Sequence, residues 1–83
     1  MPHERTQPTE IDRKVGRRMR ICREMIGLTV EQAAWLIERK PDELEAWEAG
    51  EAPIPARVIY NASVGYGFDV KSFIPGTEEP RPQ

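Results

Sequence analysis

The sequence predicts an all-α protein, a bundle of five short helices joined by tight connections. Apolar residues recur at spacings of three and four along most of the chain, which is the period of a helix with one buried face. Glycine and proline interrupt this pattern, and no segment alternates apolar and polar residues as a half-buried strand would. With 83 residues the chain is long enough for one small domain with a core of modest size.

The first predicted helix ends at Gly27, because glycine adopts the left-handed conformation that terminates many helices. Its buried face is an apolar stripe with successive spacings of four, four, three and four residues, formed by Ile11, Val15, Met19, Cys22 and Ile26. Cys22 is the single cysteine, so it cannot close an intrachain disulfide. We therefore expect a buried thiol in a protein of the reducing cytoplasm.

A second helix is predicted from about Val30 to Ile37. The Thr29 hydroxyl can accept a hydrogen bond from an unpaired backbone N–H at the start of this helix, and Gln32 can reach back to complete a capping box. This helix is only about two turns long.

A third helix is predicted to begin at Pro41 and to end at Gly50. Proline suits the first turn because its missing N–H has no partner there, and the acidic Asp42 and Glu43 favour the positive end of the helix dipole. Two side chains on one face of this helix point towards the core, Leu44 and Trp47.

A fourth helix is predicted over roughly residues 56–64, after an extended segment that contains two prolines. Asp69 can cap a fifth, shorter helix that runs through Phe73 and Ile74. Four aromatic residues fit these last two helices and are interpreted as core rather than as a dimer interface: Tyr60, Tyr66, Phe68 and Phe73.

The two ends of the chain differ in composition from its centre. Residues 1–9 and 75–83 are rich in Pro, Glu, Thr and Gln and hold almost no apolar side chains, so burial cannot offset the entropy of ordering them. We predict flexible tails at both ends and one domain over residues 10–74. No segment has the apolar length of a membrane span or the apolar centre of a signal peptide, which favours the cytoplasm.

Charge is distributed unevenly, although the formal net charge is only −2. One short segment carries a basic cluster, Arg13, Lys14, Arg17, Arg18, Arg20 and Arg23. Another carries an acidic cluster, Glu38, Asp42, Glu43, Glu45, Glu48 and Glu51. We expect a basic end and an acidic face, for which solvation is the simplest role.

Catalysis and metal binding have little support in the sequence. His3 stands alone in the predicted tail, Cys22 has no neighbouring histidine, and no pair of carboxylates is set in an apolar segment. One His and one Cys in separate segments cannot complete a zinc site. We expect a protein that is not an enzyme and that uses no cofactor or metal.

A family resemblance is carried by three runs of sequence, Arg17–Thr29, Glu31–Ala34 and Leu44–Gly50. They resemble the Cro-like phage-repressor family of helix-turn-helix proteins, also called the XRE family, and the similarity covers most of the chain. It implies a five-helix, lambda-repressor-like bundle whose second and third helices form the helix-turn-helix. It also implies a structural ion pair between Arg23 and Glu48.

The resemblance further implies that the third helix enters the major groove of duplex DNA. The residues expected to reach base edges are Pro41, Asp42, Glu43, Glu45 and Ala46. Those expected to contact phosphates are Lys14, Arg17, Arg18, Arg20, Thr29, Arg39 and Lys40. No base-edge residue is an Arg, Asn or Gln, the types that pair best with guanine and adenine, and three carboxylates near phosphates lower affinity.

The turn between the second and third helices also departs from the family pattern. Glu38 stands where the family prefers a left-handed glycine, and that conformation costs a residue with a Cβ about 1 kcal/mol. A reshaped turn would remove this cost.

Two hypotheses of function follow. The first is a DNA-binding transcriptional regulator that occupies duplex DNA as a homodimer and performs no catalysis. The second is a protein-interaction module, of antitoxin or antirepressor type, that uses the acidic third helix with Trp35 and Leu36. We interpret these two apolar residues as additional core, with an exposed patch for a protein partner as the alternative.

Overall fold

The computed structural model describes residues 7–76 of the chain. Its elements are α1 (Glu10–Met25), α2 (Val30–Leu36), α3 (Pro41–Glu48), α4 (Ala56–Tyr66) and the 3-10 helix η1 (Val70–Phe73). These described residues contain no strand, which confirms the all-α class. The count of five helices is not confirmed, because the fifth segment is a single 3-10 turn. The predicted tails, residues 1–9 and 75–83, lie mostly outside the described part.

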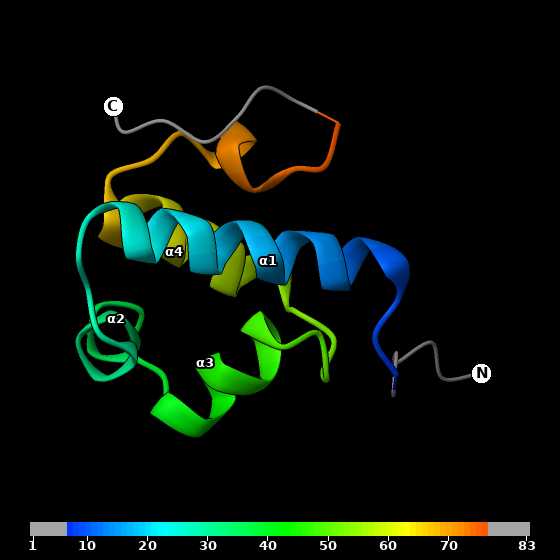
Figure 1. The fold of residues 1–83 in the computed structure, drawn as a ribbon, viewed down its shortest axis with the longest axis horizontal. Helices are drawn as coiled ribbons and strands as arrows, with labels where there is room; N and C mark the ends of the chain where they lie inside the picture. Colours follow the sequence, from blue (N-terminus) through cyan, green and yellow to red (C-terminus); the bar gives the residue numbers. More distant parts are fainter. Residues whose placement is uncertain (1–6, 77–83) are drawn as a thin grey trace.

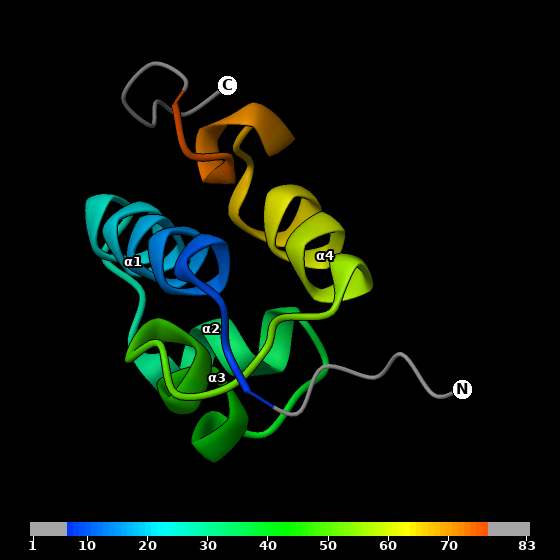
Figure 2. The same cartoon turned by 90° about the vertical axis from the view of Figure 1, so that its right-hand side faces the viewer.

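The helices form two layers with η1 on top. α1 and α4 lie side by side, with α2 and α3 beneath them, and η1 packs on the other side of α1 and α4 (Figures 1 and 2). α3 contacts both α1 and α2, so two neighbours fix its direction.

The core lies between these layers and takes side chains from every element. Its buried apolar residues are Val15, Met19, Cys22, Ala33, Ala34, Ile37, Leu44, Trp47, Ile54, Val58, Ala62, Tyr66, Phe68 and Phe73. Three of the four aromatic residues assigned to the last helices are in this core, but Tyr60 is exposed.

The predicted stripe of α1 is wrong at both ends, because Ile11 and Ile26 are exposed. In the first turn of α1 the buried side chain is that of Asp12. Its Oδ1 accepts a hydrogen bond from the Ile54 backbone N–H at 3.1 Å. Asp12 also completes a capping box with Thr9, a residue placed in the predicted tail. At the other end, Ile26 is already the C-cap of the helix.

The crossing of α1 and α3 depends on Gly16. A Cβ built on this residue would overlap the carbonyl oxygen of Trp47, so only glycine permits the observed approach. The other end of Trp47 is fixed as well, because its indole Nε1 donates to the Pro53 carbonyl at 3.0 Å. α3 is therefore held against α1 and against the chain that follows it.

The turn between α2 and α3 keeps the family geometry without a glycine. Glu38 adopts a φ of 59°, its N–H donates to Trp35 O at 3.1 Å, and Arg39 N–H donates to Ala34 O at 2.9 Å. This pair of bonds is the Schellman motif, which α1 and α3 form with Gly27 and Gly50. The turn is not reshaped, and the strain falls on Glu38.

Replacing Glu38 by glycine is expected to stabilise the protein. The change relieves the left-handed strain, partly offset by the greater freedom of glycine in the unfolded chain, for a net gain of about 0.5–1 kcal/mol. Thermal unfolding should show a melting temperature raised by roughly 2–6 °C. Glu38→Ala is the control, since it removes the charge and keeps the Cβ. An equal gain in that variant would show that charge, not backbone strain, is responsible.

Alkaline pH is expected to weaken the fold through Cys22. Burial raises the pKa of this thiol from 9.0 to about 11, with Arg18 acting weakly in the opposite direction. Between these values the unfolded chain loses a proton that the folded chain keeps, so the free energy of unfolding falls as pH rises, by up to roughly 2–3 kcal/mol. Urea unfolding from pH 8 to 11 measures this slope. Cys22→Ala should be less stable throughout but should lose less with pH, and parallel curves would contradict the assignment.

Candidate nucleic-acid interface

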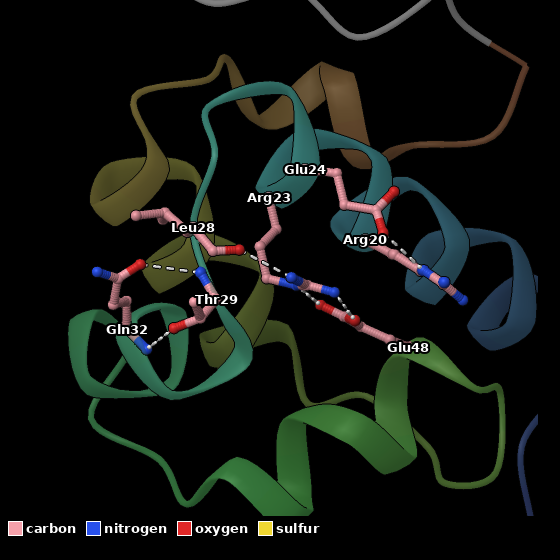
Figure 3. A network of polar contacts seen from close by, with 7 residues as sticks. All are labelled: Arg20, Arg23, Glu24, Leu28, Thr29, Gln32 and Glu48. Carbon is pink, nitrogen blue, oxygen red and sulfur yellow. Dashed lines mark hydrogen bonds and ion pairs between the residues drawn. The ribbon is translucent and has the colours of Figure 1, made fainter.

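One buried ion pair fixes the position of α3 relative to α1 and α2. Arg23 Nε and Nη2 donate to the two carboxylate oxygens of Glu48 at 2.8 and 3.0 Å (Figure 3). Arg23 Nη1 donates to the Leu28 carbonyl at 2.8 Å, just before α2 begins. The Glu48 carboxylate raises the pKa of Arg23, whereas burial acts against it. One guanidinium thus joins α1, the start of α2 and the end of α3.

The predicted capping box at the start of α2 is confirmed. Thr29 Oγ1 accepts from Gln32 N–H at 3.0 Å, and Gln32 Oε1 accepts from Thr29 N–H at 2.9 Å (Figure 3). The Thr29 hydroxyl acts only as an acceptor in this box. Its own proton can therefore still be donated to a phosphate oxygen while the oxygen caps α2.

The predicted base-edge residues lie on the outer side of α3. Asp42, Glu43 and Glu45 are exposed, and Pro41 and Ala46 are half-buried. The carboxylate of Glu43 is not a free acceptor, because its Oε1 accepts from the Lys40 N–H at 3.0 Å and so caps its own helix. This capping role was not predicted from the sequence, although the three-residue spacing from Lys40 to Glu43 is that of a capping box.

The predicted phosphate contacts fall into two groups. Arg18 and Arg20 are engaged: Arg18 Nη1 donates to the Ser72 carbonyl at 3.1 Å, and Arg20 pairs with Glu24 at 3.1 Å. The remaining basic side chains are exposed and form no ion pair with another described residue: Lys14, Arg17, Arg39 and Lys40. The side chains of this second group are therefore better placed to contact a ligand than those of Arg18 and Arg20, which already have partners within the fold.

The outer side of α2 and α3 is more acidic than basic. Its exposed carboxylates are those of Glu31, Glu38, Asp42, Glu43 and Glu45, whereas its exposed cations are Arg39 and Lys40. Such a surface repels phosphates unless the cations lie closer to them than the carboxylates do.

The interpretation of Trp35 and Leu36 as additional core is wrong. Trp35 is 78% exposed and Leu36 is 38% exposed, because both follow the buried Ala33 and Ala34 on the outward side of α2. The seven residues of α2 place only a narrow face in the core, and small side chains fill it.

The described residues offer no metal site and no membrane span. Nowhere in residues 7–76 do three His, Cys, Asp or Glu side chains come together to hold an ion. Within that same range, every helix is too short or too polar to traverse a bilayer. His3, the only histidine, lies outside the described residues.

Comparison with known families and structures identifies the arrangement of α2 and α3. A family model described as a helix-turn-helix domain matches residues 14–71. The restriction-modification controller protein C.AhdI from Aeromonas hydrophila superposes with a TM-score of 0.72 and 21% identity, over 76% of this chain and 96% of that chain. The clp gene regulator ClgR from Corynebacterium glutamicum gives 0.75 and 18%, over 80% and 70%.

An enzyme contains a similar domain. Hydroxypropylphosphonic acid epoxidase from S. wedmorenis gives a TM-score of 0.72 and 17% identity, over 82% of this chain but 36% of the enzyme. The similarity concerns a minor part of that enzyme, and at these identities all three structures show a shared fold alone. Curated protein sequences gave no significant match.

The buried ion pair is expected to be essential to the fold. Glu48→Gln leaves the Arg23 charge buried without a compensating carboxylate, which should cost about 3 kcal/mol in urea unfolding. Glu24→Gln is the matched control, because Glu24 pairs with Arg20 at the surface and its loss should change stability by less than about 0.5 kcal/mol. Equal losses in the two variants would contradict the central role of the buried pair.

Proposed function

Because the chain belongs to the helix-turn-helix domain family, we propose that it is a transcriptional regulator that binds duplex DNA through α3 and performs no catalysis. The observation that carries this proposal is the intact α2–turn–α3 unit. Its turn keeps the Schellman geometry at the cost of strain in Glu38, and its third helix keeps an outer side open to solvent. A unit held in this way by Arg23 and Glu48 is suited to insert α3 into a major groove.

Base contacts in this proposal come from a small set of side chains. Asp42 and Glu45 are the exposed carboxylates of α3 that do not cap the helix, and a carboxylate accepts a hydrogen bond from the amino group of cytosine. Ala46 offers a methyl group suited to the methyl group of thymine. The favoured strand is therefore rich in pyrimidines where α3 contacts it.

Phosphate contacts come from the exposed cations that flank α3. Arg39 and Lys40 lie in the turn before it, and Lys14 and Arg17 lie on α1. Because carboxylates dominate the face between them, binding to random DNA is weak and falls steeply with salt. A homodimer places two α3 helices in successive major grooves, about 34 Å apart, and so recovers affinity on a palindromic site.

Fluorescence anisotropy of a labelled random duplex tests the proposal at low and moderate salt. Lys40→Ala should weaken binding several-fold and lower the salt slope by about one unit, because one phosphate contact is lost. Lys71→Ala is the matched control, because it changes the net charge equally. Lys71 is an exposed residue of η1, and η1 lies across α1 from α3 (Figure 1), so this variant should bind DNA as the unmodified protein does.

Reversing a charge on α3 should change DNA affinity in the opposite direction. Glu45→Lys should tighten binding to random DNA, since a repulsive carboxylate becomes a cation that attracts phosphate. Absence of salt-dependent binding by the unmodified protein, even at low salt, would overturn the proposal and turn the search towards a protein bound by the acidic face.

A further inference from the structure

An apolar surface extends across α2 and α4 outside the proposed DNA contacts. This α2–α4 surface consists of Leu28, Trp35, Leu36, Tyr60 and Val64. Trp35, Val64 and Tyr60 are 78%, 65% and 61% exposed, although all three lie on well-formed helices. Large apolar side chains held open in this way mark interaction sites in soluble proteins.

Leu36 makes this surface continuous. It lines a hollow of about 410 Å³ together with Leu28 and Trp35, and it also lines a second hollow, of about 320 Å³, together with Tyr60 and Val64. No residue of α3 lines either hollow, so occupation of the surface leaves the outer side of α3 free.

The size of the surface fits a protein interface. From the exposed fractions, its side chains present roughly 500 Å² of largely apolar area, in the upper range for the largest patch of a monomeric protein. A standard interface covers about 800 Å² on each partner, so the apolar centre would form most of it and the surrounding polar residues the remainder.

The charges around the surface are balanced. Leu36 also lines a third hollow, of about 390 Å³, with Trp35. Four exposed charged side chains line the three hollows, two carboxylates and two guanidinium groups: Glu31, Glu38, Arg39 and Arg57. None of the four forms an ion pair with another described residue. A rim with equal numbers of positive and negative side chains is suited to a second copy of itself, because each charge can face an opposite charge on the other copy. A strongly charged partner would instead require a rim in which one sign of charge predominates.

The last helices offer a weaker surface for self-association. Tyr66, Phe68 and Phe73 are buried, and Tyr66 and Phe68 each pack edge-on against Phe73. The large apolar side chains that η1 and its C-cap leave exposed are Val70 and Ile74.

We propose that two copies of this chain associate through the α2–α4 surface, in a twofold arrangement with Trp35 and Leu36 near the axis. This inference rests on the proposed function and deepens its homodimer by assigning the interface. It is tested without DNA, because Arg39 of the rim is also a proposed phosphate contact.

Sedimentation equilibrium without DNA tests the interface. The protein should dimerise at micromolar concentrations, and Trp35→Ala should weaken association by more than about tenfold, because exposed tryptophans at the centre of interfaces contribute most to binding. Val64→Asp should do the same, whereas Val70→Asp should have no effect. The two valine variants form a matched pair, since both residues are exposed and the substitution is identical. Circular dichroism verifies that each variant is folded.

Complementary charge variants test the twofold arrangement itself. Glu31→Lys with Glu38→Lys makes the rim wholly basic, and Arg39→Glu with Arg57→Glu makes it wholly acidic. Each double variant alone should be monomeric, and their mixture should form heterodimers, because opposite rims then face each other. A docking site for an unrelated protein predicts no such recovery.

Several results would overturn the proposal. One is a protein that stays monomeric at hundreds of micromolar. Another is a dimer that is lost with Val70→Asp and kept with Val64→Asp, and a third is a failure of the two charge variants to combine. These results are independent of DNA affinity, which the anisotropy measurement reports on its own.

Discussion

The fold depends on the buried ion pair between Arg23 and Glu48. The three hydrogen bonds of the Arg23 guanidinium join α1 to the end of α3, through Glu48, and to the residue before α2 begins, through the Leu28 carbonyl. The pair therefore fixes the mutual orientation of α1, α2 and α3 in a chain too small for a large core. Desolvation makes such a pair a poor source of net stability, but any other arrangement of these helices would leave its charges buried without partners. Its main effect is therefore specificity, since it selects one orientation of α3.

Local signals in the sequence predicted the helices better than they predicted the core. Thr29 and Gln32 are adjacent to the helix end that they cap, so their role follows from spacing alone. The apolar stripe of α1 failed at Ile11 because Asp12 is recruited by the backbone of Ile54, a residue far away in sequence. Only tertiary structure shows such a contact. The prediction for Trp35 was wrong for a related reason. The sequence shows that this side chain is apolar, but it does not show whether the side chain points into the core or into solvent.

The sequence alone assigned residues to the candidate interface, but it did not show which of their charged groups already have partners within the fold. The sequence showed the acidic character of α3, but only the structure shows that Glu43 caps its own helix and that Arg18 donates a hydrogen bond to a carbonyl of η1. Whether a charge is available to a ligand depends on its partners within the fold. The resemblance that assigned these residues to DNA carries no information about those partners.

The strained Glu38 has a genetic consequence. Glutamate and glycine codons differ at their second base, so a single mutation would give the turn the residue that its backbone favours. The carboxylate that such a mutation would delete also borders the α2–α4 surface. In the proposed dimer, stability and self-association therefore make opposite demands on one codon, because the same substitution relieves the strain of the turn and removes a charge from the rim.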